Sequence, residues 1–177
     1  ALDSIPEVGS AVNFDYGKGV SRLDLAAGCS RIRIDRCGLY PTRRFYSPCS
    51  FSRLNIELAV GSSTSAAARI VRTLDVILDI SGGDSFSDIY GDLRFKNVYA
   101  PKQLAIRNNI PLVLLPQTYG PFSNQRLMGL ASAACKNSFA CFSRDPVGYQ
   151  RLQELLGGTF NPERHINGVD MSFAMKP

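Results

Sequence analysis

The segment spanning residues 81–88 combines residue types that could hold a hydroxyl-bearing or anionic ligand close to the backbone. Gly82 and Gly83 allow a sharp turn and let backbone N–H groups approach a ligand closely. Asp84 and Ser85 add a carboxylate and a hydroxyl within reach of sugar hydroxyls. The competing interpretation is structural, with Asp84 capping the turn and Ser85 hydrogen bonding to the backbone. We therefore treat all four residues as candidates for substrate binding.

Two further segments contribute candidate ligand-binding side chains. Gln117 and Thr118 offer an amide and a hydroxyl from a loop that prolines flank on both sides. Arg144 is the best single candidate for binding an anion, because its planar guanidinium can hold a carboxylate or phosphate bidentately. Arg144 could equally form an ion pair with the neighbouring Asp145 or with another acid.

Other patterns of catalytic or metal-binding residues are missing from the sequence. His165 is the only histidine and lies outside these segments, which is more typical of a surface or packing residue. The five cysteines include no CxxC pair, so we expect no metal site. The sequence also lacks a P-loop and a GxGxxG fingerprint, which argues against ATP hydrolysis and a classical NAD site. No catalytic residue can be assigned from these patterns.

The composition is that of a soluble globular chain with one core, since 45% of the 177 residues are hydrophobic and 20% are charged. The net charge is +5, and many of the positive charges in the first half belong to arginines: Arg31, Arg33, Arg36, Arg43, Arg44 and Arg53. This charge suits an anionic donor or acidic glycan, whereas no nucleic-acid-reading motif is present. No apolar run approaches the ~20 residues of a membrane-spanning helix, and no signal sequence is evident, so we expect a cytoplasmic location without an integral membrane segment.

The candidate segments each follow an expected β-strand. Three stretches rich in apolar residues end at one of these segments: residues 75–80, 112–115 and 139–142. Helical patterns follow them, over residues 93–109, 124–136 and 147–156. This repeated order of strand, loop and helix predicts an α/β fold with a Rossmann-like parallel sheet and crossover helices. The ligand crevice of such a sheet lies outside the carboxyl ends of its strands, so the candidate loops should share one edge.

Local signals predict where several elements begin. Ser123 is the expected N-cap of the second helix, and Pro101 is expected at a first turn or a break of the first. Asp145 followed by proline is typical of a helix start and predicts the beginning of the third helix. Gly, Ser, Arg and Pro interrupt the region before residue 66, where alternation still predicts a strand over residues 30–35 and suggests another over residues 11–15.

The chain resembles the polysaccharide pyruvyl transferases in three stretches taken together: DVILDISGGDSFSDIYG, PLVLLPQTYGPF and FSRDPVGYQRLQELLG. A GGD turn, a PQT loop followed by GPF, and an RD pair before a helix recur together in that family, so the combination is more specific than any one piece. The resemblance covers residues 74–175. Residues 168–173 also resemble the aspartate-containing strand end that closes the family's first lobe.

The resemblance implies an enzyme with two Rossmann-like lobes, similar to GT-B glycosyltransferases, and an active site in the cleft between them. Residues 1–177 would form a single lobe, the N-terminal one, truncated at both ends and lacking its C-terminal lobe. The implied reaction transfers pyruvate from phosphoenolpyruvate to a sugar of a polysaccharide or its precursor, forming a ketal. The family's catalytic histidine belongs to the second lobe, so we assign no catalytic residue here and expect the isolated chain to be inactive.

The implied partners are phosphoenolpyruvate as the donor substrate, a saccharide acceptor and the missing C-terminal lobe, with no cofactor. Arg144 would supply one cation to the donor, while Asp84, Ser85 and Gln117 would position acceptor hydroxyls or shape the loop walls. Two alternatives share this fold. One is a nucleotide-sugar glycosyltransferase lobe of GT-B type, and the other is a non-catalytic sugar-binding module.

Overall fold

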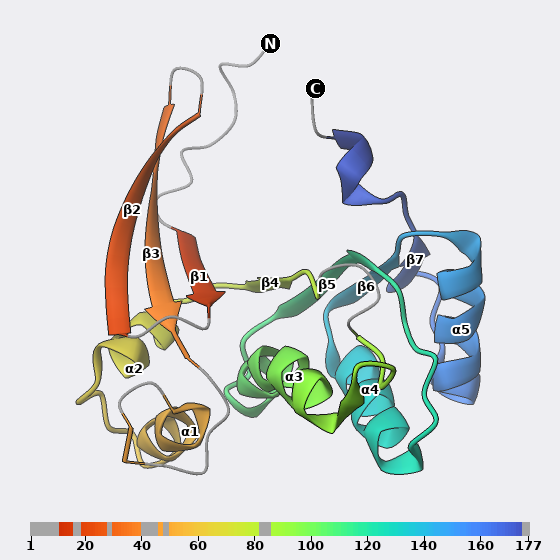
Figure 1. The fold of residues 1–177 in the computed structure, drawn as a ribbon, viewed down its shortest axis with the longest axis horizontal. Coiled ribbons are helices and arrows are strands. Elements are labelled where there is room, and N and C mark those ends of the chain that lie inside the picture. Colours follow the sequence, from red (N-terminus) through yellow and green to blue (C-terminus); the bar gives the residue numbers. More distant parts are fainter. Residues whose placement is uncertain are drawn as a thin grey trace. The chain divides into compact units, whose positions relative to one another are not determined.

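The computed structural model describes residues 11–15, 19–27, 30–39, 46–47, 50–81 and 86–174. The chain divides into two compact units, Ala1–Thr73 and Leu74–Pro177, and each is described by itself below (Figure 1). The Rossmann-like sheet lies within the second unit. The assignment of residues 1–177 to a single lobe stays a prediction.

The first unit contains a three-stranded sheet in the order β1-β3-β2. Strands β2 (Gly19–Ala27) and β3 (Ser30–Gly38) pair antiparallel as a hairpin, and β1 (Ala11–Asp15) pairs parallel with β3. The expected strands over residues 11–15 and 30–35 are confirmed, and β3 extends to Gly38. Strand β2 was not predicted, because charged and small residues interrupt its apolar pattern.

Two short helices complete the first unit, α1 (Phe51–Ala59) and α2 (Ala66–Val71). The carboxylate of Glu57 on α1 accepts hydrogen bonds from Arg53 Nε at 2.9 Å, from Ser65 Oγ at 2.6 Å and from the Ser65 backbone N–H at 3.1 Å. The Ser65 hydroxyl in turn accepts from the Ala68 N–H, which caps the start of α2. Glu57 therefore ties the middle of α1 to the first turn of α2.

The second unit contains a four-stranded sheet whose strands follow the chain in the order β4-β5-β6-β7. The strands are β4 (Ile77–Asp79), β5 (Leu112–Gln117), β6 (Ala140–Ser143) and β7 (His165–Asn167), and all neighbouring pairs are parallel. The three expected strands of this region are confirmed with small shifts of their ends. The fourth, β7, was not predicted.

Helices connect the successive strands: α3 (Gly91–Arg107), α4 (Gln125–Asn137) and α5 (Pro146–Leu156), the last followed by the short helix η1 (Gly157–Thr159). A second short helix, η2 (Met171–Ala174), follows β7. Right-handed crossovers between parallel strands in sequential order put the helices on one face of the sheet, and Figure 1 shows α3 and α4 below it. This arrangement confirms the expected Rossmann-like α/β fold.

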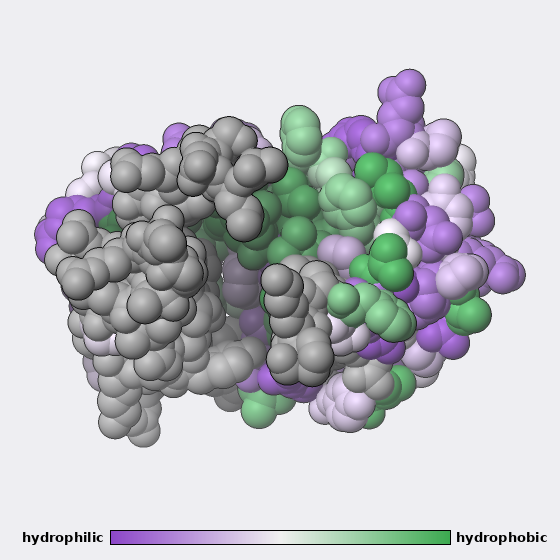
Figure 2. Space-filling view, turned by 90° about the horizontal axis from the view of Figure 1, so that it is seen from above, coloured by the Kyte–Doolittle hydropathy of each residue, from purple (hydrophilic) through white to green (hydrophobic). Residues whose placement is uncertain are grey.

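The two faces of this sheet differ in burial. Leu112 and Leu114 are buried, while Val113 and Leu115 between them are partly exposed, as the alternation of a strand requires. On β4, Leu78 is 60% exposed although Ile77 is buried. Figure 2 shows hydrophobic side chains gathered on the side of the sheet opposite α3 and α4. The core of the unit therefore lies between the sheet and the helix layer.

Two local predictions need correction. Asn124, rather than Ser123, is the N-cap of α4, because its Oδ1 accepts hydrogen bonds from the Arg126 and Leu127 N–H groups. Pro101 lies inside α3 and does not break the helix. Residues on both sides of it are buried, Phe95 and Val98 before and Leu104 and Ala105 after, and this packing offsets the lost hydrogen bond.

The predicted start of α5 is confirmed in detail. Asp145 is the N-cap, and its Oδ1 accepts a hydrogen bond from the Gly148 N–H at 2.6 Å. Pro146 occupies the first helical position, where its missing N–H has no intrahelical partner to lose. Gly157 ends the helix with a φ of 50°, a backbone conformation that favours glycine.

Candidate functional site

The carboxyl ends of β4, β5, β6 and β7 meet at one edge of the sheet, as parallel pairing requires. Hydrogen bonds join the segments that leave this edge. The Arg144 N–H donates to the Gln117 carbonyl at 3.3 Å, and the Gly168 N–H donates to the Ser143 carbonyl at 2.7 Å. The prediction that the loops after the three expected strands share one edge is confirmed, and the candidate site is this edge.

The first candidate loop is described only at its two ends. Gly82, Gly83, Asp84 and Ser85 lie outside the described residues. Ser81 before them and Phe86 after them are both buried. The roles of the four candidate residues therefore remain predictions. The structure does describe the contacts of Ser81 and Phe86, the residues on either side of them.

Lys102 on α3 anchors the start of this loop and was missed by the sequence analysis. Its side chain is fully buried, and Nζ donates hydrogen bonds to Asp79 Oδ1 at 2.6 Å, Ser81 Oγ at 2.6 Å and the Val98 carbonyl at 3.0 Å. A signal was present, because Lys102 continues the helical spacing of Phe95 and Val98 and so belongs to the apolar face. A lysine on such a face implies a buried acidic partner.

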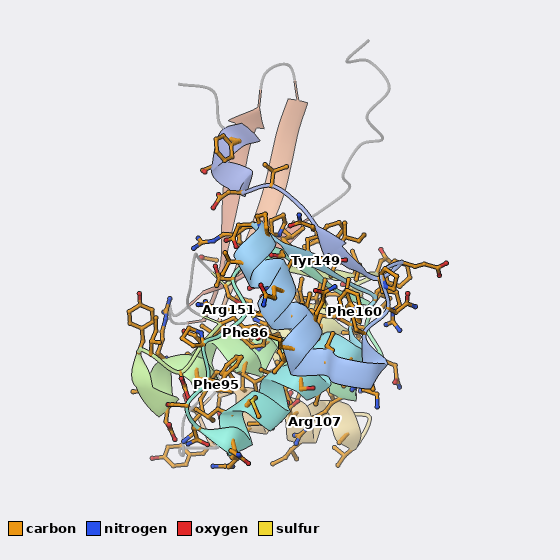
Figure 3. The ribbon with its side chains drawn as sticks, turned by 90° about the vertical axis from the view of Figure 1, so that its right-hand side faces the viewer. Phe86, Phe95, Arg107, Tyr149, Arg151 and Phe160 are labelled. Carbon is orange, nitrogen blue, oxygen red and sulfur yellow. The ribbon has the colours of Figure 1, made fainter. Side chains whose placement is uncertain are left out.

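Phe86 anchors the end of the same loop. Its ring is fully buried, stacks with Phe95 at a centroid distance of 5.9 Å and meets Tyr119 and Phe122 edge to face at 6.1 Å and 6.3 Å. Figure 3 shows Phe86 and Phe95 next to each other in the interior. The Phe86 carbonyl accepts the Gly120 N–H at 3.0 Å, so the loops that follow β4 and β5 are joined by backbone as well as rings.

Asp88 extends this connection to the start of α4. Its Oδ2 accepts the Ser123 and Asn124 backbone N–H groups, each at 2.7 Å, and the Ser123 hydroxyl at 3.0 Å. Partial burial raises the pKa of this carboxyl, but the hydrogen bonds from Asn124 and Ser123 outweigh it and the net pKa is lowered. Asp88 therefore remains ionised and holds the loop after β5.

Gln117 and Thr118 lie at the end of β5, and both are buried. The Gln117 Oε1 accepts the Ser81 backbone N–H at 3.2 Å, which links β5 directly to the β4 loop. Within the described part of the chain, Gln117 Nε2 and Thr118 Oγ1 have no partner at hydrogen-bonding geometry. The Tyr119 hydroxyl donates to the Phe142 carbonyl and lies close enough to the Gln117 side chain to interact with it weakly. These two unsatisfied polar atoms fit a place where a polar ligand completes the hydrogen bonding.

Arg144 is partly exposed and forms two long ion pairs. Its Nε lies 3.4 Å from Asp145 Oδ2, and its Nη1 lies 3.6 Å from Asp170 Oδ2. Hydrogen bonds from Ser172 lower the pKa of Asp170, with a smaller contribution from the Arg144 charge. The ion pair that the sequence offered as an alternative therefore exists in this structure.

His165 and the buried cysteines lie away from this edge. His165 begins β7, is buried, and accepts the Asn161 N–H at Nδ1 at 2.9 Å. Cys141 is its register partner on β6, and Cys135 packs nearby in α4. The burial of His165 agrees with the packing role that the sequence suggested for it, and both cysteines are buried as well.

The described residues include neither a cluster of metal-binding side chains nor a membrane-spanning helix. They contain no group of three or more His, Cys, Asp or Glu side chains placed to hold a metal ion. Among the helices that the structure describes, none has the length and apolar character needed to cross a membrane.

The fold and the shared loop edge define an α/β protein of the kind that binds ligands beyond the carboxyl ends of its parallel strands. The family model for polysaccharide pyruvyl transferases matches residues 23–163, and the chain belongs to this family. Searches of curated proteins and of solved structures gave no significant match.

Proposed function

We propose that this chain forms part of an enzyme that transfers pyruvate from phosphoenolpyruvate to two hydroxyls of a saccharide. The observation that carries the proposal is the family match over residues 23–163. The shared edge supports it, because the loops after β4, β5 and β6, which carry the candidate substrate-binding residues, leave the sheet side by side. We also propose a cytoplasmic location and a reaction without a cofactor, in a pathway that builds an exported or cell-wall polysaccharide.

The chemistry requires protonation of the methylene carbon of phosphoenolpyruvate, which leaves an oxocarbenium-like centre at the adjacent carbon. One sugar hydroxyl adds to this carbon and loses its proton. The bond between this carbon and the phosphate oxygen breaks with its electron pair, phosphate leaves, and the second hydroxyl adds and loses its proton. The products are a pyruvyl ketal and inorganic phosphate. Such a site needs cations that hold the donor's carboxylate and phosphate while positive charge develops on carbon.

Arg144 is our candidate for one of these cations. To reach a donor it must exchange its ion pairs with Asp145 and Asp170, which are 3.4 Å and 3.6 Å long and partly exposed. Long, exposed pairs of this kind contribute little to stability, whereas a charge-assisted hydrogen bond to a ligand contributes about 1.5–3 kcal/mol. The exchange is therefore energetically favourable when an anionic donor is present.

Gln117 and Thr118 are our candidates for binding the acceptor. The amide oxygen of Gln117 is committed to the Ser81 N–H, so the amide NH2 is the part that remains to donate to a ligand oxygen. Thr118 can donate or accept through its hydroxyl. Both side chains are buried in this structure, so contact with the acceptor requires the covering residues to move.

The family resemblance implies a second lobe that carries the catalytic acid, and we propose that this lobe completes the active site. The 177-residue chain alone should then bind a substrate without turning it over. NMR titration of the ¹⁵N-labelled chain with phosphoenolpyruvate, UDP-galactose and methyl β-galactopyranoside tests the proposal. Shifts of the Thr118 and Arg144 amides with phosphoenolpyruvate or the galactoside support it. Shifts with UDP-galactose alone would instead identify a nucleotide-sugar glycosyltransferase lobe.

A further inference from the structure

The ammonium group of Lys102 is fully occupied inside the second unit. An ammonium has three N–H donors, and Lys102 directs them to Asp79 Oδ1, Ser81 Oγ and the Val98 carbonyl at 2.6, 2.6 and 3.0 Å. The side chain is fully buried, so it has no donor and no surface left for a ligand. Any role in a substrate site must therefore act through its neighbours.

Lys102 contacts both residues that border the first candidate loop. Ser81 precedes Gly82 and accepts a hydrogen bond from Lys102, and Phe86 follows Ser85 with its ring centroid 4.4 Å from the Lys102 Nζ. A lysine over an aromatic face is attracted by the ring, more strongly when water is excluded. One buried cation thus holds the two ends of the segment that contains four candidate substrate-binding residues.

Ser81 connects Lys102 to β5 by hydrogen bonds. The Ser81 hydroxyl donates to Asp79 Oδ1 at 3.0 Å while accepting from Lys102, and its backbone N–H donates to Gln117 Oε1 at 3.2 Å. This last bond sets the orientation of the Gln117 amide, because only the amide oxygen can accept from an N–H. The position of Ser81 therefore decides which way the free NH2 of Gln117 points.

Stability alone does not explain why Lys102, Asp79 and Ser81 form a buried polar cluster. Replacing a buried ion pair by apolar residues of similar volume is often neutral or stabilising, so a methionine and an aliphatic residue could fill the same space. Such a core would lack the hydrogen bond to Ser81 and the attraction to the Phe86 ring. The lysine is thus best explained by the fixed placement of Ser81 and Phe86.

We propose that Lys102 is a positioning residue for the acceptor side of the site. It holds Ser81 and Phe86 in place against the end of β5 and, through Ser81, orients the Gln117 amide. This inference rests on the proposed function for the identity of the ligand, but the positioning itself can be measured without any ligand.

Two variants test the proposal in the 177-residue chain. Ser81→Ala removes the hydroxyl and leaves the Lys102–Asp79 pair intact, whereas Lys102→Met removes the charge and keeps the length of the side chain. Amide hydrogen exchange should show protection at Ser81, whose N–H donates to Gln117, falling by about tenfold or more in both variants. In Lys102→Met, protection should fall as much at Asp88, whose N–H lies two residues beyond Phe86 and donates to the Pro121 carbonyl at 3.4 Å. The amides of β5 and β6 should stay within about twofold of the unmodified chain. Affinity for methyl β-galactopyranoside, followed at the Thr118 amide, should weaken by about tenfold or more.

The matched control is Lys96→Met, which removes an exposed lysine of the same helix and should change neither readout. If Lys102→Met fails to fold, Ser81→Ala decides the question.

Unchanged protection at residues 81 and 88 in a folded variant would overturn the inference. So would normal galactoside affinity in a stable Asp79→Leu and Lys102→Met double variant, because the pair would then be purely structural. If the unmodified chain binds neither galactoside nor phosphoenolpyruvate, the proposed function fails, and hydrogen exchange alone decides the role of Lys102.

Discussion

Asp88 and Asn124 are 36 positions apart in the sequence, and a 2.7 Å hydrogen bond joins the Asn124 backbone N–H to Asp88 Oδ2. The same oxygen accepts a hydrogen bond from the Ser123 N–H, so the carboxylate satisfies backbone donors at the start of α4 that have no partner within the helix. This contact holds the loop after β5 in one position relative to the segment after β4. The candidate site thus depends on residues that would not contact a substrate.

Asp88→Asn should lower the free energy of unfolding by about 1–2 kcal/mol at pH 7, because an ionised partner of two backbone donors is lost. The lowered pKa of Asp88 means that this stabilisation is present above the pKa of the unfolded chain and disappears as the pH falls through the folded-state pKa. Urea unfolding at pH 7 and at acidic pH measures both effects. Asp75→Asn, at an exposed carboxylate outside the helices, is the control and should change stability by less than about 0.5 kcal/mol.

Glu57→Gln should destabilise the first unit. Burial raises the pKa of Glu57, but hydrogen bonds from Ser65 and Arg53 lower it from 4.5 to about 2. Its stabilisation is therefore complete above pH 4.5 and is lost as the pH falls toward 2, with a total on the order of 3 kcal/mol. Circular dichroism melts across this pH range should show a smaller pH dependence in the variant. Glu163→Gln, at an exposed carboxylate, should melt like the unmodified chain.

Gly148→Ala should destabilise the second unit, since a methyl group at this position would lie 2.8 Å from Ser143 Oγ. That hydroxyl is held by its hydrogen bond to the Asp145 carbonyl at 2.7 Å, so relief of the clash disturbs the cap of α5. We expect a loss of about 1–3 kcal/mol in denaturant unfolding. Gly129→Ala in α4 meets no atom within 4 Å and should instead add about 0.5–1 kcal/mol. Equal effects of the two substitutions would contradict this packing.

Arg144→Lys separates donor binding from ion pairing at this arginine in the proposed two-lobed enzyme. The charge remains but the bidentate fork is lost, which should cost about 1.5–3 kcal/mol if the guanidinium binds the donor. Each ~1.4 kcal/mol is a factor of ten, so kcat/KM should fall by about tenfold or more. Thermal stability should change little, because the pairs with Asp145 and Asp170 are long and partly exposed. Normal turnover in a less stable protein would assign Arg144 a structural role only, and Arg151→Lys on α5 is the control.

The sequence was most informative where local signals and tertiary packing agree. A run of apolar residues located β5, and Asp145 followed by proline located the start of α5. β7 escaped notice because three residues, two of them polar, carry little periodic signal, and its pairing with β6 defines it. Ser123 and Asn124 are both good N-cap residues, so the sequence alone does not decide between them. In the structure the Ser123 hydroxyl donates to Asp88, while Asn124 Oδ1 accepts from the N–H groups at the start of α4.

The sequence predicted which loops form the candidate site, but it did not predict the side-chain contacts that hold those loops. Parallel topology alone requires the loops after successive strands to meet, and this part needed no side-chain detail. The spacing of Lys102 with Phe95 and Val98 indicated burial, but the sequence could not identify its partners, because Asp79 and Ser81 lie 23 and 21 positions away. Long-range polar contacts of this kind depend on the folded arrangement.

Product analysis in an enzyme that contains this chain and a second lobe tests the central claim most directly. Incubation with phosphoenolpyruvate and a galactoside acceptor should release inorganic phosphate and form a pyruvyl ketal in equal amounts, as followed by a phosphate assay and mass spectrometry. UDP-galactose in place of phosphoenolpyruvate should give no product. Galactosyl transfer from UDP-galactose, with phosphoenolpyruvate left unconsumed, would contradict the assignment of pyruvyl transfer.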